Sequence, residues 1–171
     1  MKVLVVVDMQ NDFVTGALGT PEACAVTEPV CRKIRGFDGT VVFTRDTHTA
    51  RYLETQEGRR LPVVHCVEGT QGHALHPSVA ALSEGCRIFD KPSFGSVELA
   101  QYIAQLGADS VTFVGVCTDI CVISNALLVK AFLPEAEIFV DASCCAGVTP
   151  ESHLRALESM KTCQITVENE K

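Results

Sequence analysis

The sequence predicts an α/β protein in which a parallel sheet carries helices on both of its faces. Short apolar runs rich in β-branched residues alternate with amphipathic helix patterns along the chain. This βαβ rhythm is typical of parallel strands joined by right-handed crossovers. A length of 171 residues and a hydrophobic content of 47% fit one domain, residues 1–171, with a single sizeable core.

Six runs are expected to form strands, because each is short and mostly apolar, as strands covered on both faces are. The segments between them carry helix signals. In chain order the runs are Lys2–Val7, Thr40–Thr44, Arg87–Phe89, Ser110–Gly115, Ala136–Val140 and Gln164–Val167.

Three of the segments between these runs have recognisable helix starts. Ser96 can cap a helix that ends at Gly107, and Thr149 can cap another with Pro150 at its first position. Asp119 is expected to cap a third helix, because apolar residues follow it at helical spacing.

The stretch from Thr47 to Pro77 is the exception to this regularity. It is rich in Gly, Pro, Glu, Arg and His, and no strand or helix pattern extends through it. A long irregular excursion inside a compact domain is usually functional.

Charge and composition exclude several classes of partner. The net charge is -7 and no basic run is present, which argues against a nucleic-acid partner. The apolar run Val3–Val7 is too short for a signal peptide or a membrane span, so we expect no membrane partner and a cytoplasmic location. The nine cysteines are odd in number and form no CxxC pair, so they are expected to be reduced thiols.

Chemically useful side chains follow four of the predicted strands. Asp8 follows the first, Asp46 the second and Lys91 the third, and the segment GVCTDIC follows the fourth. Ligands bind outside the carboxyl ends of the strands in open parallel sheets. Four such ends that deliver acids, an amine and a thiol to one edge therefore indicate an active site.

Cys121 is the candidate nucleophile in GVCTDIC. It would lie in the first turn of the helix, where the helix dipole and free N–H groups favour a thiolate. Lys91 could add a cation there, and Asp8 could accept the thiol proton. Cys117 lies in the turn before the helix and lacks that placement.

Three segments carry a resemblance to a known family. LVVVDMQNDF, FDKPSF and VGVCTDICV together resemble the isochorismatase-like cysteine hydrolases, in family order and at similar separations. The resemblance implies a catalytic triad of Asp8, Lys91 and Cys121. It also implies a six-stranded, mostly parallel sheet in a three-layer α/β/α sandwich, and it is compatible with a homo-oligomer.

A metal site is implied within the same resemblance. Nicotinamidases of this family have a D-x-H motif followed by a His or Glu and a final His, which match Asp46, His48, Glu57 and His65. Glu54 is the alternative third ligand. Two carboxylates and two imidazoles suit one divalent ion, with zinc preferred over iron or manganese.

The resemblance implies hydrolysis of nicotinamide to nicotinate and ammonia through a thioester on Cys121. Phe13 and Phe94 offer aromatic walls for a flat ring. Two alternatives stay open: another amidase of the same superfamily, acting on carbamoyl or ureido compounds, and a metal-binding or redox-sensing module without turnover. The second alternative rests on the spacing of Cys117 and Cys121.

The turn before Cys121 carries one further expectation. Acyl transfer needs N–H donors aimed at the developing oxyanion, and the amides of Cys117 and Cys121 are the candidates. Because GVCTDIC resembles the family turn, we expect a cis peptide bond between Val116 and Cys117.

Overall fold

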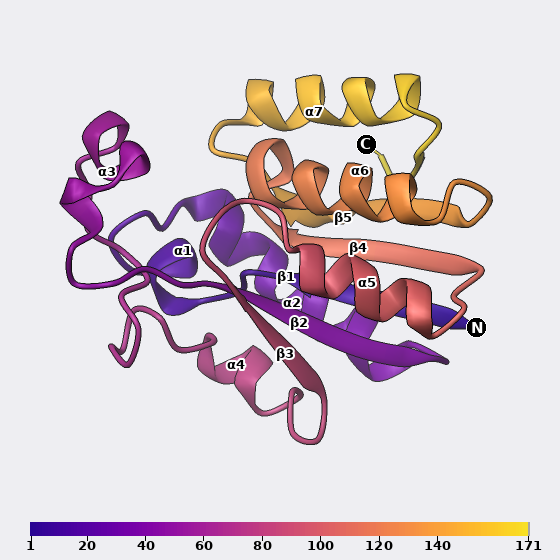
Figure 1. Ribbon diagram of the computed structural model, residues 1–171, viewed down its shortest axis with the longest axis horizontal. Coiled ribbons are helices and arrows are strands. Elements are labelled where there is room, and N and C mark those ends of the chain that lie inside the picture. The colour runs from indigo at the N-terminus through magenta and orange to yellow at the C-terminus, as the bar shows by residue number, and fades with distance from the viewer. Residues whose placement is uncertain (171) are drawn as a thin grey trace.

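The computed structural model describes residues 1–170 and contains one six-stranded sheet in which every pairing is parallel, in the order β3-β2-β1-β4-β5-β6. Helices cover both faces of the sheet (Figure 1). The predicted three-layer α/β/α sandwich is therefore confirmed. The strands are Lys2–Val7 (β1), Thr40–Asp46 (β2), Arg87–Lys91 (β3), Ser110–Val116 (β4), Glu137–Ala146 (β5) and Thr166–Glu168 (β6).

The helices differ widely in length. The longest is α2. Two single-turn elements each precede a regular helix: a 3₁₀ turn, η1, comes before α3, and a π-helical turn, η2, leads directly into α6. No helix in the described part of the chain has both the length and the apolar character that a membrane crossing requires. The elements are Asn11–Val14 (α1), Pro21–Gly36 (α2), Tyr52–Glu54 (η1), Gln56–Arg60 (α3), Pro77–Ala80 (α4), Val97–Gln105 (α5), Thr118–Val122 (η2), Ile123–Phe132 (α6) and Pro150–Thr162 (α7).

The side chains of β1 alternate between two apolar cores. Val3, Val5 and Val7 pack on one face with α5, α6 and α7. Leu4 and Val6 pack on the other face with residues of α1, α2 and α4. Successive strand residues point to opposite faces, so a run that is apolar throughout fits a central strand buried on both sides.

Two of the three expected helix caps are confirmed. The Ser96 hydroxyl accepts a hydrogen bond from the Leu99 amide at 3.1 Å, and Thr149 forms a reciprocal capping box with Ser152. These caps satisfy backbone N–H groups that have no partner within the helix.

The expectation that Asp119 caps the third helix is wrong. The chain enters that helix through η2, whose first residue is Thr118, and the Val122 amide donates to the Cys117 carbonyl at 3.0 Å. The helical turn thus begins before Asp119. The Asp119 carboxylate instead accepts a hydrogen bond from the Val148 amide at 3.0 Å.

Gly115 allows β4 to approach β1 closely at the end of the sheet where η2 begins. Its φ is +114°, and a Cβ atom at this position would lie 2.1 Å from the Val7 carbonyl oxygen. Only glycine is compatible with both the backbone conformation and this approach. The close approach brings the end of β4 beside Asp8, which follows β1 directly.

Candidate active site

The ends of three elements bring Asp8, Lys91 and Cys121 together. Asp8 follows β1, Lys91 is the last residue of β3, and Cys121 lies in η2. Lys91 Nζ lies 2.7 Å from Asp8 Oδ2 and 3.4 Å from Cys121 Sγ. Only 0%, 1% and 5% of Asp8, Lys91 and Cys121 is exposed. The buried ammonium thus contacts both the acid and the thiol.

Asp8 is held in place by β2. Its φ of 47° lies in the left-handed region, which aspartate tolerates better than most residues. The Asp8 amide donates to the Thr44 carbonyl at 3.2 Å, and the Thr44 hydroxyl donates to Asp8 Oδ1 at 2.6 Å. Oδ2 is thereby left to face Lys91.

Burial and the charges within this cluster together shift the pKa values of its three groups. Burial raises the pKa of the Cys121 thiol well above its ordinary value; Asp8 adds to the effect and Lys91 opposes it. Burial also raises the pKa of Asp8, against the attraction of Lys91. Burial would lower the pKa of Lys91, but attraction to Asp8, Cys121 and Asp46 outweighs it, so that pKa is raised. The burial of Cys121 thus opposes the thiolate that a helix N-terminus alone would favour.

Four further side chains converge beside this cluster. Asp46 ends β2, His48 follows it, Glu57 lies on α3, and His65 lies in the irregular stretch after α3. One ligand atom from each lies within 4.8 Å of the others. His48 Nε2 is 2.8 Å from Asp46 Oδ2 and 3.7 Å from Glu57 Oε1. His65 Nε2 is 3.5 Å and 3.8 Å from the same two oxygens.

This geometry fits a metal ion. Four ligands held at about 2.0–2.1 Å around zinc would lie roughly 3.3 Å from one another, close to these separations. His48 Nε2 is buried and makes no hydrogen bond within residues 1–170. His65 Nδ1 lies 2.7 Å from the Val63 carbonyl oxygen, an arrangement that orients a ligating imidazole by its other nitrogen. Burial and the nearby Asp46 raise the pKa of Glu57, a repulsion that a bound cation would relieve.

Glu54 is not part of this cluster. Its carboxylate is exposed and pairs with Arg51 on the outer side of the excursion. Glu57 lies on the next helical turn, α3, which is capped by the Thr55 hydroxyl. Of the two glutamates considered from the sequence, the structure therefore brings Glu57 to the other three residues.

Asp46 connects the two groups of side chains. Its Oδ2 faces the imidazoles, while Oδ1 lies 3.4 Å from Lys91 Nζ. Burial would raise the pKa of Asp46, but His48, His65 and Lys91 hold it well below its ordinary value. Asp46 is thus an anion shared between the candidate metal site and the candidate triad.

Gln10 is a residue of this site that the sequence reasoning missed. Its Oε1 accepts from the Asp46 amide at 2.7 Å, and its Nε2 donates to the Asp46 carbonyl at 2.8 Å and the His73 carbonyl at 2.9 Å. Gln10 is fully buried and fixes the backbone of Asp46. The sequence feature that could have identified Gln10 as a site residue is its position in DMQNDF, two residues after Asp8.

Cys121 and the four clustered residues Asp46, His48, Glu57 and His65 border one cavity of about 680 Å³, whereas Asp8, Lys91 and Gln10 do not. Phe13 and Phe94 both line it, as expected from the sequence, together with Cys117 and Cys121. The Phe13 ring lies 5.5 Å from the His65 ring, centroid to centroid. The cavity thus has aromatic walls, a thiol and the four candidate ligands in one space.

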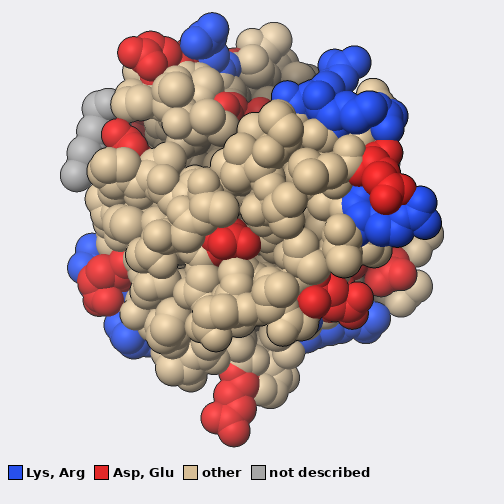
Figure 2. Space-filling view, turned by 90° about the vertical axis from the view of Figure 1, so that its left-hand side faces the viewer, with Lys and Arg blue, Asp and Glu red and all other residues tan. Residues whose placement is uncertain are grey.

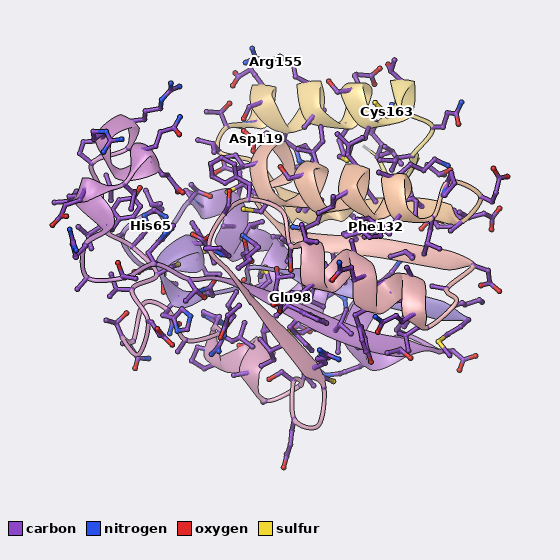
Figure 3. The ribbon with its side chains drawn as sticks, in the orientation of Figure 1. His65, Glu98, Asp119, Phe132, Arg155 and Cys163 are labelled. Carbon is purple, nitrogen blue, oxygen red and sulfur yellow. The ribbon has the colours of Figure 1, made fainter. Side chains whose placement is uncertain are left out.

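The cavity lies at the carboxyl ends of the strands. His65 is seen on this side, below α3, whereas Cys163 lies at the far end of α7 (Figure 3). Viewed from this side, most of the surface is uncharged, an acidic side chain lies near its centre, and the other charged groups lie mainly round the rim, with the largest group of Lys and Arg at the upper right (Figure 2).

The turn between β4 and η2 has the expected peptide geometry. The bond between Val116 and Cys117 is cis, which confirms that prediction. Cys117 borders the cavity, and burial raises the pKa of its thiol to about 12. Each of the nine cysteines, all within residues 1–170, is a free thiol.

Comparisons with known proteins agree with this architecture. The chain is similar to the pyrazinamidase of Pyrococcus horikoshii, solved in complex with zinc, at 32% identity over 97% of each chain with a TM-score of 0.85. It is 29% identical to the nicotinamidase/pyrazinamidase of Mycobacterium tuberculosis over 96% of this chain and 97% of that protein. It is 25% identical to the nicotinamidase of Saccharomyces cerevisiae over 98% and 99% of the two chains. The family model of the isochorismatase domain matches residues 2–170, and the chain therefore belongs to the isochorismatase family.

Proposed function

We propose that this protein is an amidohydrolase that converts nicotinamide to nicotinate and ammonia. The observation that carries the proposal is the buried Lys91 ammonium, which contacts Asp8 and Cys121 directly beside the four-residue cluster. The similarity to nicotinamidases and pyrazinamidases along nearly the full chain supports a pyridine or pyrazine carboxamide as substrate.

The first half of the reaction uses Asp8 as the general base. A carboxylate whose pKa is raised by burial is a stronger base, and Asp8 can take the proton of Cys121 as the thiol attacks the carboxamide carbon. Lys91 stabilises the thiolate that forms. The amides of Cys117 and Cys121 are the proposed donors to the oxyanion of the tetrahedral intermediate.

In the second half, Asp8 returns its proton to the departing amine, which leaves as ammonia. Water then attacks the thioester carbon, and Asp8 takes a proton from this water. The thioester bond to Cys121 breaks, Asp8 returns this proton to the Cys121 thiolate, and nicotinic acid loses its remaining proton to solvent and is released as nicotinate. Asp8 therefore acts as base, acid, base and acid in turn, and its buried position keeps these proton transfers out of contact with bulk water.

A metal ion held by Asp46, His48, Glu57 and His65 would supply a Lewis acid that binds the ring nitrogen of the substrate. The aromatic side chains Phe13 and Phe94 would hold the ring between them and fix the carboxamide near Cys121. We infer zinc as the bound ion, because two imidazoles and two carboxylates form a set that zinc accepts.

Ammonia release from a panel of amides tests the substrate. We expect turnover of nicotinamide and pyrazinamide. For benzamide, which lacks the ring nitrogen, we expect kcat/KM to be at least about 100-fold lower. Carbamoyl and ureido compounds, the alternative substrates, are tested in the same assay. Turnover of one of these with nicotinamide inert would replace the proposed substrate while leaving the hydrolase chemistry in place.

Arg60 is expected to affect the product more than the substrate. It is the exposed last residue of α3, it borders the cavity, and it has no ion-pair partner among residues 1–170. Nicotinamide is neutral and nicotinate is an anion. We therefore expect Arg60→Gln to weaken inhibition by nicotinate by about two- to fivefold at low salt, the range of one exposed charge interaction, with little change in KM.

Arg59→Gln is the matched control, because Arg59 lies on the same helix but donates to the Glu54 carbonyl and does not border the cavity. The difference between the two variants should shrink in high salt, which screens exposed charges. Equal effects of both substitutions on nicotinate inhibition would contradict a specific role for Arg60.

A further inference from the structure

Asn125 occupies a buried position on α6, one helical turn after Cys121. None of its surface is exposed. Its Nδ2 donates to the Cys121 carbonyl at 2.8 Å and to the Phe94 carbonyl at 3.0 Å, and its Oδ1 accepts from the Ser96 amide at 2.9 Å. Both donors of the side-chain amide and its acceptor are therefore used.

These bonds join the nucleophile to the segment between β3 and α5, residues 92–96. Pro92, Ser93 and Phe94 of this segment border the cavity. Lys91 precedes the segment, and its Nζ donates to the Ser93 carbonyl at 3.1 Å. The segment is thus held by the ammonium of Lys91 at one point and by the amide of Asn125 at two others.

Both anchoring residues, Lys91 and Asn125, contact Cys121. Lys91 Nζ lies 3.4 Å from Cys121 Sγ, while Asn125 binds the backbone carbonyl of Cys121 itself. A rotation of η2 relative to residues 92–96 would change the separation of Nζ and Sγ. Asn125 opposes that rotation, since its one side chain spans both elements.

We propose that Asn125 is a positioning residue for the hydrolysis, which sets the distance and angle between the Cys121 thiol and Lys91 and fixes the Phe94 wall. It does not touch the reacting atoms. The inference rests on the proposed cysteine chemistry, and it goes beyond it by assigning the alignment of the nucleophile to a side chain outside the cavity.

The variant Asn125→Leu keeps the approximate size of the side chain and removes all three hydrogen bonds. We expect kcat for nicotinamide to fall about 10- to 100-fold, the cost of a misplacement of about 1 Å, with KM changed by less than about threefold. The rate at which iodoacetamide alkylates Cys121, followed by mass spectrometry of its peptide, should fall in parallel, because Lys91 no longer stabilises the thiolate.

Thr27→Val is the matched control. Thr27 is also a buried helical residue, and its hydroxyl donates to the carbonyl four residues earlier, Ala23, at 3.1 Å. Its side chain makes no hydrogen bond to Cys121 or to residues 92–96 within the described chain, so kcat and Cys121 alkylation should stay within about twofold of the unsubstituted protein. If Asn125→Leu does not fold, Asn125→Ala carries the same test, since alanine is the most favourable helix residue.

An unchanged kcat in the folded variant would overturn the proposal. So would a rise in KM alone, or a loss of activity equal to the loss of folded protein measured by circular dichroism. The proposed function has a separate point of failure, namely a protein that does not hydrolyse nicotinamide at all. In that case the alkylation rate of Cys121 still decides whether Asn125 aligns the thiol.

Discussion

Replacing Cys121 with alanine is expected to lower kcat for amide hydrolysis by about 10⁴-fold or more, as loss of a covalent nucleophile does in other hydrolases. The fold should persist, because Cys121 is a small side chain and alanine leaves only a small void. Ammonia release measures the loss, and circular dichroism checks the fold. Lys91→Met and Asp8→Asn should each cause losses of similar order, since the three groups act as one unit.

Two cysteine controls separate this prediction from the redox alternative. Cys163→Ala removes an exposed thiol at the end of α7 and should leave kcat unchanged. Cys117→Ala keeps the backbone amide proposed for the oxyanion, so its loss should stay below about tenfold. A redox module built on the pair would instead require both Cys117 and Cys121 equally and would be indifferent to Lys91. Full activity of Cys121→Ala would contradict the assignment of the nucleophile.

The sheet was predictable because its strands are buried on both faces. Such strands are continuous apolar runs, and all six predicted runs coincide or overlap with observed strands. The positions of Asp8, Asp46 and Lys91 at the strand ends followed directly. Parallel strands deliver their last residues to one edge, so order along the chain was enough to bring these residues together.

The path of the irregular stretch from Thr47 to Pro77 was harder to predict from the sequence, because it depends on contacts that form only in the folded protein. The D-x-H motif located Asp46 and His48, and the family resemblance favoured Glu57 over Glu54. Spacing alone could not show that Glu57 on α3 faces the cluster while Glu54 on η1 pairs with Arg51. The roles of Gln10 and Asn125 depend on hydrogen bonds to backbone groups 36 and 31 residues away. Propensity and periodicity carry no information about such long-range bonds.

The start of the nucleophile helix was misjudged for a local reason. Aspartate is a favoured cap, and the residues after Asp119 have helical spacing. The structure begins the helical turn at Thr118, because the Cys117 carbonyl accepts from the amides of Ile120 and Val122 at once. A tight turn of this kind overrides the preference of a single side chain.

Loss of Glu57 or His65 is expected to lower the affinity for zinc by more than about 100-fold, beyond the 10- to 100-fold typical of residues that only support a ligand. The substitutions are Glu57→Ala and His65→Ala, and metal content after dialysis is measured by elemental analysis. Glu54→Ala is the matched control, because Glu54 lies in the same excursion but pairs with Arg51 away from the cluster. It should retain metal at the level of the unsubstituted protein.

Metal removal should also lower the thermal stability of the protein, which gives a measure independent of activity. Asp46 and Glu57 are close together, and burial with this proximity already raises the pKa of Glu57. A bound cation would offset the repulsion, and a ligand present at 100 times its Kd stabilises the native state by about 2.7 kcal/mol. We therefore expect a chelator to lower the Tm by several degrees in the unsubstituted protein and in Glu54→Ala, and to change it little in His65→Ala, whose site no longer holds the ion. An identical Tm with and without chelator in all three proteins, together with absence of metal from the purified unsubstituted chain, would rule out the four-residue site. The substrate would then have to be held by the cavity walls and the triad alone.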